Sequence, residues 1–97
     1  MIQSFARKEI ERFFFDEKVP RGAGWANVKK IVRRKLAVVD AAGILSDLKV
    51  PPGNQLEALK RDLVGYHGIR INDQWRVIFK WWAGAAGPSE VDVVDYH

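Results

Sequence analysis

The chain has 97 residues, enough for a single domain spanning residues 1–97, and 47% of them are hydrophobic, which supports a modest core. Its net charge of +4 favours a polyanionic partner. The absence of cysteine excludes disulfides, thiolate metal sites and a cysteine nucleophile, and two histidines are a poor ligand set, so we expect no metal and no cofactor. The apolar runs are too short to span a membrane, and charged residues at positions 7–9 interrupt any signal peptide, so we expect a cytoplasmic protein without membrane contact.

The first half of the chain predicts a short strand and two helices. Residues 1–5 are apolar enough for an edge strand, and apolar residues at helical spacing predict a helix over residues 6–17, with Ser4 as a candidate cap. After a loop rich in glycine, a second helix should span about residues 25–42 and end at Gly43. Its buried stripe should be Val28, Ile31, Val32, Leu36 and Val39.

The opposite side of the second helix is basic and carries Lys29, Lys30, Arg33 and Arg34. Such a face is ordinarily just solvated. However, basic residues are concentrated in the first half of the chain, and these four cluster without interleaved glutamates, which modestly favours contact with nucleic acid.

The second half of the chain predicts strands. Residues 45–50 are ambiguous, and the segment Pro-Pro-Gly-Asn at 51–54 is a rigid turn. Runs rich in β-branched and aromatic residues then predict strands at 56–59, 65–71, 75–82 and 90–96. The order β-α-α-β-β-β-β with short connections favours an α+β fold, in which two N-terminal helices pack on a mainly antiparallel sheet.

A three-residue loop at residues 72–74 would place Arg70 directly opposite Arg76 on one face of a hairpin. The other face would then be apolar, with Ile69, Ile71, Trp75, Val77 and Phe79, and a structural His67. Opposed like charges are unfavourable, so the two guanidinium groups could share an anion such as a phosphate. Alternatively, both arginines point to solvent or pair with Asp62, Asp92 or Glu57.

The closing residues Asp95, Tyr96 and His97 follow the last predicted strand, and a basic cluster at Lys60 and Arg61 lies upstream. A histidine can exchange a proton near neutral pH. A terminal histidine can also be a frayed end, Tyr96 a packing residue, and Asp95 a solvated strand end.

Four segments together resemble the HigB toxins of bacterial type II toxin–antitoxin systems, within the RelE/ParE superfamily. They are MIQSF at 1–5, VPPGNQLEALK at 50–60, IRINDQWR at 69–76 and VDYH at 94–97. The resemblance covers nearly the whole chain and implies a RelE-like fold.

The resemblance also implies a ribosome-dependent mRNA endonuclease, in which a ribose 2′-OH attacks the adjacent phosphate without a metal ion. Carried over by position, the catalytic residues would be Lys60, Arg76, Asp95, Tyr96 and His97. Arg61 and Arg70, with the basic helix face, would contact RNA. The chain has Glu57 where some HigB proteins have histidine, so Glu57 could be the base or could only neutralise Lys60.

The partners implied by the resemblance are a HigA-like helix-turn-helix antitoxin, the ribosome with its RNA, and mRNA, with operator DNA bound only through the antitoxin complex. Two other interpretations stay open. A ParE-like inhibitor of DNA gyrase would share the fold without cleaving RNA, and a basic nucleic-acid-binding domain would not be toxic at all.

Overall fold

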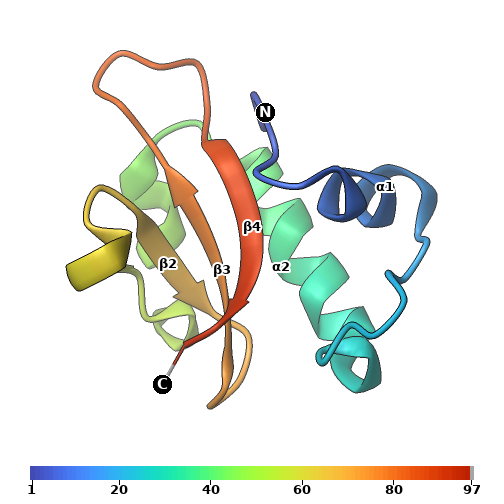
Figure 1. Ribbon diagram of the computed structural model, residues 1–97. Coiled ribbons are helices and arrows are strands. Elements are labelled where there is room, and N and C mark those ends of the chain that lie inside the picture. Colours follow the sequence, from blue (N-terminus) through green and yellow to red (C-terminus); the bar gives the residue numbers. More distant parts are fainter. Residues whose placement is uncertain (97) are drawn as a thin grey trace.

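The computed structural model, described over residues 1–96, combines two α-helices with a four-stranded antiparallel sheet (Figure 1). The helices are α1 (Lys8–Asp16) and α2 (Lys29–Ala41). The strands, in their order across the sheet, are β1 (Glu57–Ala58), β2 (His67–Arg70), β3 (Trp75–Lys80) and β4 (Ser89–Asp95). Helix α1 contacts β4 and helix α2 contacts β3. The predicted α+β class is therefore confirmed.

One core lies between the two helices and the face of the sheet that they cover, which we call the inner face. Its buried side chains include Ile10, Phe13, Val32, Leu36, Val39, Ile69, Val77, Phe79, Val91 and Val93. They recur every three or four residues along the helices and every second residue along the strands, as expected for faces that pack together. Val28 and Ile31 are partly buried against this core. Neither helix within residues 1–96 is long and apolar enough to cross a membrane.

The predicted hairpin between β2 and β3 is confirmed. Arg70 pairs with Arg76 and Ile69 with Val77, and the Ile71 amide donates to the Trp75 carbonyl at 3.0 Å. The side chain of Asn72 fixes the loop, because its Oδ1 accepts hydrogen bonds from the backbone amides of Gln74 and Trp75, at 2.9 and 2.8 Å. His67 faces the core side, where its ring stacks on Phe79.

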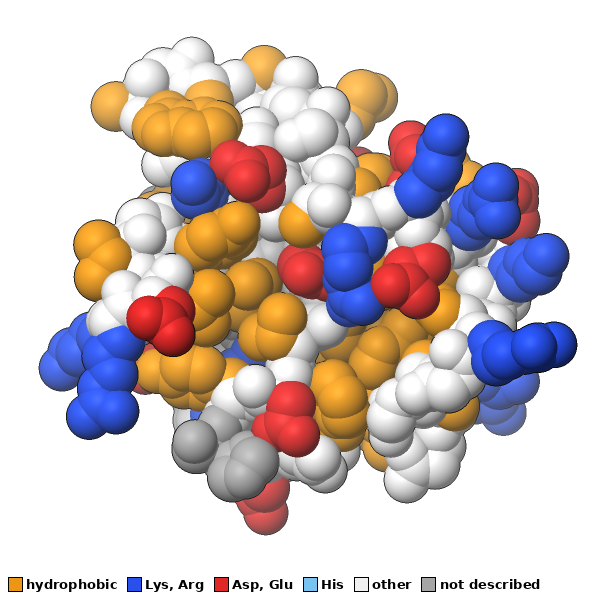
Figure 2. Space-filling view, in the orientation of Figure 1, with side chains coloured by type: hydrophobic (Ala, Val, Ile, Leu, Met, Phe, Trp, Pro, Cys, Tyr) orange, Lys and Arg blue, Asp and Glu red, His pale blue; other side chains and the backbone are white. Residues whose placement is uncertain are grey.

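The opposite face of the sheet, which we call the outer face, is not covered by α1 or α2. At its centre Leu59 and Ile78 are buried on either side of Gly68. A Cβ at Gly68 would lie 3.5 Å from Leu59 and 3.6 Å from Ile78. Because Gly68 has no side chain, the side chains of Leu59 and Ile78 can approach each other over β2. Figure 2 shows hydrophobic side chains gathered over the strands between charged groups.

Residues 1–5 do not form the predicted edge strand. Phe5 makes one isolated parallel bridge to Val91 on β4. Beyond it, the backbone groups that would extend a ladder bind side chains instead. The Val93 carbonyl accepts a hydrogen bond from Arg7 Nη2 at 3.1 Å, and the Val93 amide donates to Asp92 Oδ1 at 2.8 Å.

The ends of both helices also differ from the prediction. Ser4 does not cap α1, because its Oγ accepts a hydrogen bond from the Glu90 amide and the helix starts at Lys8. Helix α2 is preceded by a 3₁₀ turn at Ala26–Val28, and it ends in extended backbone at Ala42 rather than at a left-handed glycine. The amide of Gly43 donates to Asp47 Oδ2 at 2.9 Å, and this contact begins the 3₁₀ helix at Leu45–Lys49, the ambiguous segment.

Candidate active site

Arg76 lies on the outer face, near the β2–β3 hairpin, with a side chain that is only 13% exposed. Its Nη1 donates to the carbonyl of Asn72 at 2.8 Å. Its Nε lies 4.0 Å from Glu57 Oε1, is buried, and makes no hydrogen bond to any residue among 1–96. A buried donor left unsatisfied costs about 1–3 kcal/mol, so Arg76 is held with a hydrogen bond still to make.

Tyr96 covers the guanidinium group of Arg76. The Arg76 Cζ atom lies 5.8 Å from the centre of the Tyr96 ring, within the range of a cation–π contact. The Tyr96 amide donates to the carbonyl of Gln74 at 2.7 Å, which ties the end of β4 to the hairpin. Tyr96 therefore has a defined place beside Arg76.

Lys60 and Arg61 bring positive charge close to Tyr96. Together with Asp62, Leu63 and Tyr96 they line an open cavity of about 460 Å³. Lys60 directly precedes a 3₁₀ turn at Arg61–Leu63. The cavity is large enough for a nucleotide, and both of its basic side chains belong to exposed residues.

Glu57 reaches this cluster from β1, the short outermost strand of the sheet. It pairs with Gly68 on β2, and Gly68 has no side chain to separate it from β3. The Glu57 carboxylate is about half exposed, so solvent and a ligand can both reach it. The outer face thus holds a cation, an aromatic ring and a carboxylate within one cluster, which can bind a phosphate and exchange protons beside it.

Comparison with known proteins identifies the family. The family model "RelE-like toxin of type II toxin-antitoxin system HigB" matches residues 3–97. The chain is 38% identical over 96 residues to "Toxin HigB-1" of Vibrio cholerae serotype O1, covering 99% of this chain and all of that toxin. It is also 38% identical over 56 residues to an uncharacterized protein of Haemophilus influenzae, covering 58% of this chain and 55% of that protein.

The chain belongs to the HigB-like toxin family. It is therefore a RelE-like toxin of a type II toxin–antitoxin system, and its partner is an antitoxin.

Asp95 and Tyr96, two members of the predicted C-terminal group, lie on opposite sides of the sheet. Asp95 pairs with Trp75 across the sheet, and strand alternation places it on the side of Val93, whereas Tyr96 follows Val94 on the side of Arg76. The Asp95 carboxylate accepts a hydrogen bond from Gln74 Nε2 at 2.8 Å. His97 lies outside the described residues.

Arg70 lies directly opposite Arg76 in the hairpin, but its guanidinium group pairs with Asp73 in the hairpin loop. Burial lowers the pKa of Lys35 on α2, and the nearby charges of Arg34 and Arg70 lower this pKa further. The opposed arginines thus have separate acidic neighbours, and of the alternatives considered for Arg76 the structure shows Glu57.

The basic face of α2 is directed away from the sheet. Lys29, Lys30 and Arg33 line a small cavity of about 150 Å³, where Arg33 pairs with Glu17 at 2.5 Å. Because α2 packs on the inner face, this basic group does not join the cluster around Arg76 on the outer face. Arg34 is exposed and also lies apart from that cluster.

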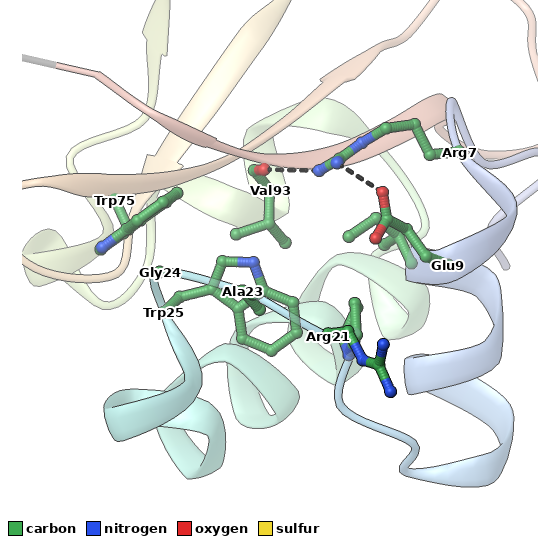
Figure 3. A pocket seen from close by; sticks show the side chains of 11 residues that line it. Arg7, Glu9, Arg21, Ala23, Gly24, Trp25, Trp75 and Val93 are labelled. Atoms are coloured by element: carbon green, nitrogen blue, oxygen red, sulfur yellow. Dashed lines mark hydrogen bonds and ion pairs between the residues drawn. The ribbon is translucent and has the colours of Figure 1, made fainter.

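A third cavity, which the sequence did not indicate, lies between the start of α1, the loop before α2 and the sheet. The cavity has a volume of about 310 Å³. Figure 3 shows the residues that line it, with Arg7 directed toward the Val93 carbonyl and Gly24 beside Trp75. Burial alone would lower the pKa of Arg7, but the hydrogen bond and charge of Asp92 raise this pKa overall. Arg7 and Asp92 are distant in sequence, so only the three-dimensional structure reveals this contact.

Proposed function

We propose that this toxin is a ribosome-dependent mRNA endonuclease whose active site is the cluster around Arg76. The observation that carries the proposal is the state of the Arg76 side chain. It is nearly buried on the otherwise uncovered outer face, beneath Tyr96, and one of its donors is unused by residues 1–96. A phosphate would offer that donor an acceptor and would compete with Glu57 for the positive charge of Arg76.

In the proposed reaction a base removes the proton of a ribose 2′-OH, and the 2′-oxygen attacks the adjacent phosphorus. The bond from phosphorus to the 5′-oxygen of the next nucleotide breaks, and an acid protonates that oxygen. The products carry a 2′,3′-cyclic phosphate and a 5′-hydroxyl. Negative charge grows on the phosphate oxygens in the transition state, where fixed cations are most effective.

We assign the charge stabilisation to Arg76, with Lys60 holding the phosphate from the cavity side. Glu57 is the candidate base, because its carboxylate is accessible and lies close to Arg76. Tyr96 would stack on a base or share the proton transfer, and His97 would be the acid. Asp95 would act through the end of β4, by keeping the hairpin and the strand in register through Gln74. Arg61 is a supporting phosphate contact at the rim of the cavity.

This cluster offers few strong acids or bases, so positioning of the message by the ribosome should supply much of the rate. We propose that the exposed basic residues of α2 contact ribosomal RNA, independently of sequence. The antitoxin would be a helix-turn-helix protein that carries the toxin to operator DNA.

The test is a reconstituted translation reaction in which RNA ends are mapped with and without toxin. Arg76→Ala should reduce cleavage by about 10²-fold or more, and Arg12→Ala, at an exposed position on α1 outside the cluster, is the matched control. Equal cleavage by Arg76→Ala would refute the assignment. Trapped gyrase–DNA complexes without cleaved message would instead support gyrase inhibition, and naked mRNA degraded as fast as ribosome-bound mRNA would contradict the dependence on the ribosome.

A further inference from the structure

A second group of a tyrosine, a cation and a carboxylate lies at the other end of the outer face. It consists of Tyr66, Lys80 and Glu90. The Lys80 Nζ atom lies 5.0 Å from the centre of the Tyr66 ring and 3.4 Å from Glu90 Oε2. The Tyr66 hydroxyl donates a long hydrogen bond, 3.4 Å, to Glu90 Oε1. The arrangement repeats that of Tyr96, Arg76 and Glu57.

A β-bulge in β4 directs Glu90 into this group. The partners of β3 change from Ile78–Asp92 to Lys80–Ser89, so two residues of β4 lie opposite one residue of β3. Glu90 has a φ of 52°, a left-handed conformation that is uncommon outside glycine. The backbone thus departs from a regular strand at the residue that holds Lys80.

The two groups lie on the same face of the sheet. Arg76 and Lys80 are four residues apart on the same face of β3, which corresponds to roughly 13 Å. The side chains of Leu59 and Ile78 lie between them, and both are apolar and buried. A short single-stranded segment of RNA can span this distance. Tyr66 and Lys80 are partly exposed, so a ligand on the sheet can reach both.

We propose that Tyr66, Lys80 and Glu90 form a second nucleotide-binding site, which holds single-stranded RNA a few nucleotides away from the phosphate at Arg76. A base would stack on Tyr66 in the place that the Lys80 ammonium group now occupies, and the displaced ammonium group would bind a backbone phosphate. The occupant follows from continuity with the Arg76 cluster, so this inference rests on the proposed function.

Each residue then has a distinct role. Tyr66 supplies a stacking surface, the usual means by which proteins hold single-stranded bases. Burial raises the pKa of Tyr66, and the charge of Glu90 raises it further, so the phenol stays neutral at pH 7. Glu90 holds Lys80 while RNA is absent, and competes with the phosphate when RNA arrives.

The experiment measures binding of an uncleavable 2′-O-methyl oligoribonucleotide to the whole protein, by NMR titration at several salt concentrations. Tyr66→Leu should weaken binding about 10-fold, as expected for the loss of one stacked base, whereas Tyr66→Phe should bind nearly as wild type. Lys80→Gln should weaken binding and reduce the slope of log K against log salt by about 0.7. Lys49→Gln removes an exposed lysine on another surface and is the matched control.

Glu90→Gln should change the RNA affinity in the opposite direction, because it removes a negative charge beside the incoming phosphate. It should bind RNA several-fold more tightly than the wild type, about as expected from the loss of one repulsive charge near the surface. If the group only stabilised the bulge, Glu90→Gln would lower the melting temperature and leave RNA affinity unchanged, which would overturn the proposal.

Ribosome-dependent cleavage separates this inference from the function on which it rests. If the wild type cuts mRNA, and Tyr66→Leu and Lys80→Gln cut equally well at every toxin concentration, the second site is wrong and the nuclease survives. If the wild type binds RNA as described here but cuts no mRNA, the nuclease assignment fails alone. Variants that bind RNA normally but lose the antitoxin would assign this surface to the protein partner and overturn the proposal.

Discussion

Replacing Gly24 with alanine should destabilise the toxin, because the ring of Trp75 occupies the space that a side chain would need. A Cβ at this position would lie 2.6 Å from Trp75 Cζ2 and 3.0 Å from Cη2. Carbon atoms in contact prefer about 3.5–4.0 Å, so the ring must move by roughly 1 Å. Trp75 packs against the core and its backbone pairs with Asp95, which leaves little room for this movement.

Overpacking of this kind typically costs about 1–3 kcal/mol. For a domain of this size each kcal/mol lowers the melting temperature by roughly 4–8 °C, so we expect a fall of about 4–24 °C. An alanine also restricts the conformations of the unfolded chain. Where the native backbone accepts an alanine, this effect stabilises the folded state by about 0.4–1 kcal/mol. Gly53→Ala should show only this second effect, because nothing lies within 4 Å of a Cβ there.

Thermal unfolding followed by circular dichroism would measure both variants, and a double-mutant cycle tests the cause. In a Trp75→Leu background the clashing ring atoms are absent, so Gly24→Ala should cost little. The reasoning fails if Gly24→Ala melts together with Gly53→Ala. It also fails if Gly24→Ala is equally harmful with and without the indole ring.

Three further outcomes are expected. Asn54 is fully buried, donates to the carbonyls of Leu48 and Val50 and accepts from Lys35, so Asn54→Ala should lower the free energy of unfolding by about 1–3 kcal/mol in urea titrations. The raised pKa of Tyr66 means that the folded state holds this proton more tightly than the unfolded state. Its contribution to stability is present below about pH 10 and is lost as pH rises through the folded-state pKa, so the wild type should lose more stability than Tyr66→Phe between pH 9 and 11. If Glu57 is the base, Glu57→Gln should reduce cleavage by about 10²-fold, and Glu57→His should recover part of the rate near neutral pH; full activity of Glu57→Gln would remove Glu57 from the mechanism.

The sheet could be predicted from the sequence because its signals are local. The loop at residues 72–74 sets the register of β2 and β3, and the alternation of Val77 and Phe79 with Arg76 and Ile78 assigns the two faces. Once the register is known, the position of Arg76 on the outer face follows. The resemblance then directed attention to Tyr96, which the structure places beside Arg76.

The N-terminal segment could not be predicted, because the contacts that shape it come from the far end of the chain. Residues 1–5 have the composition of a strand, but the carboxylate of Asp92 and the side chain of Arg7 occupy the positions where pairing would continue. Arg70 shows the same limit. The strand register places it opposite Arg76, yet its guanidinium group pairs with Asp73 in the hairpin loop.

The contacts around Val93 have a further consequence for the edge of the sheet at β4. The outward backbone groups of Val91 are bonded to residues 4 and 6, and those of Val93 to Asp92 and Arg7. An exposed strand edge with free backbone groups is a template on which other chains can pair and aggregate. In this stretch of β4 such pairing would first have to break four hydrogen bonds. The toxin is thereby protected, along this edge, from association with copies of itself.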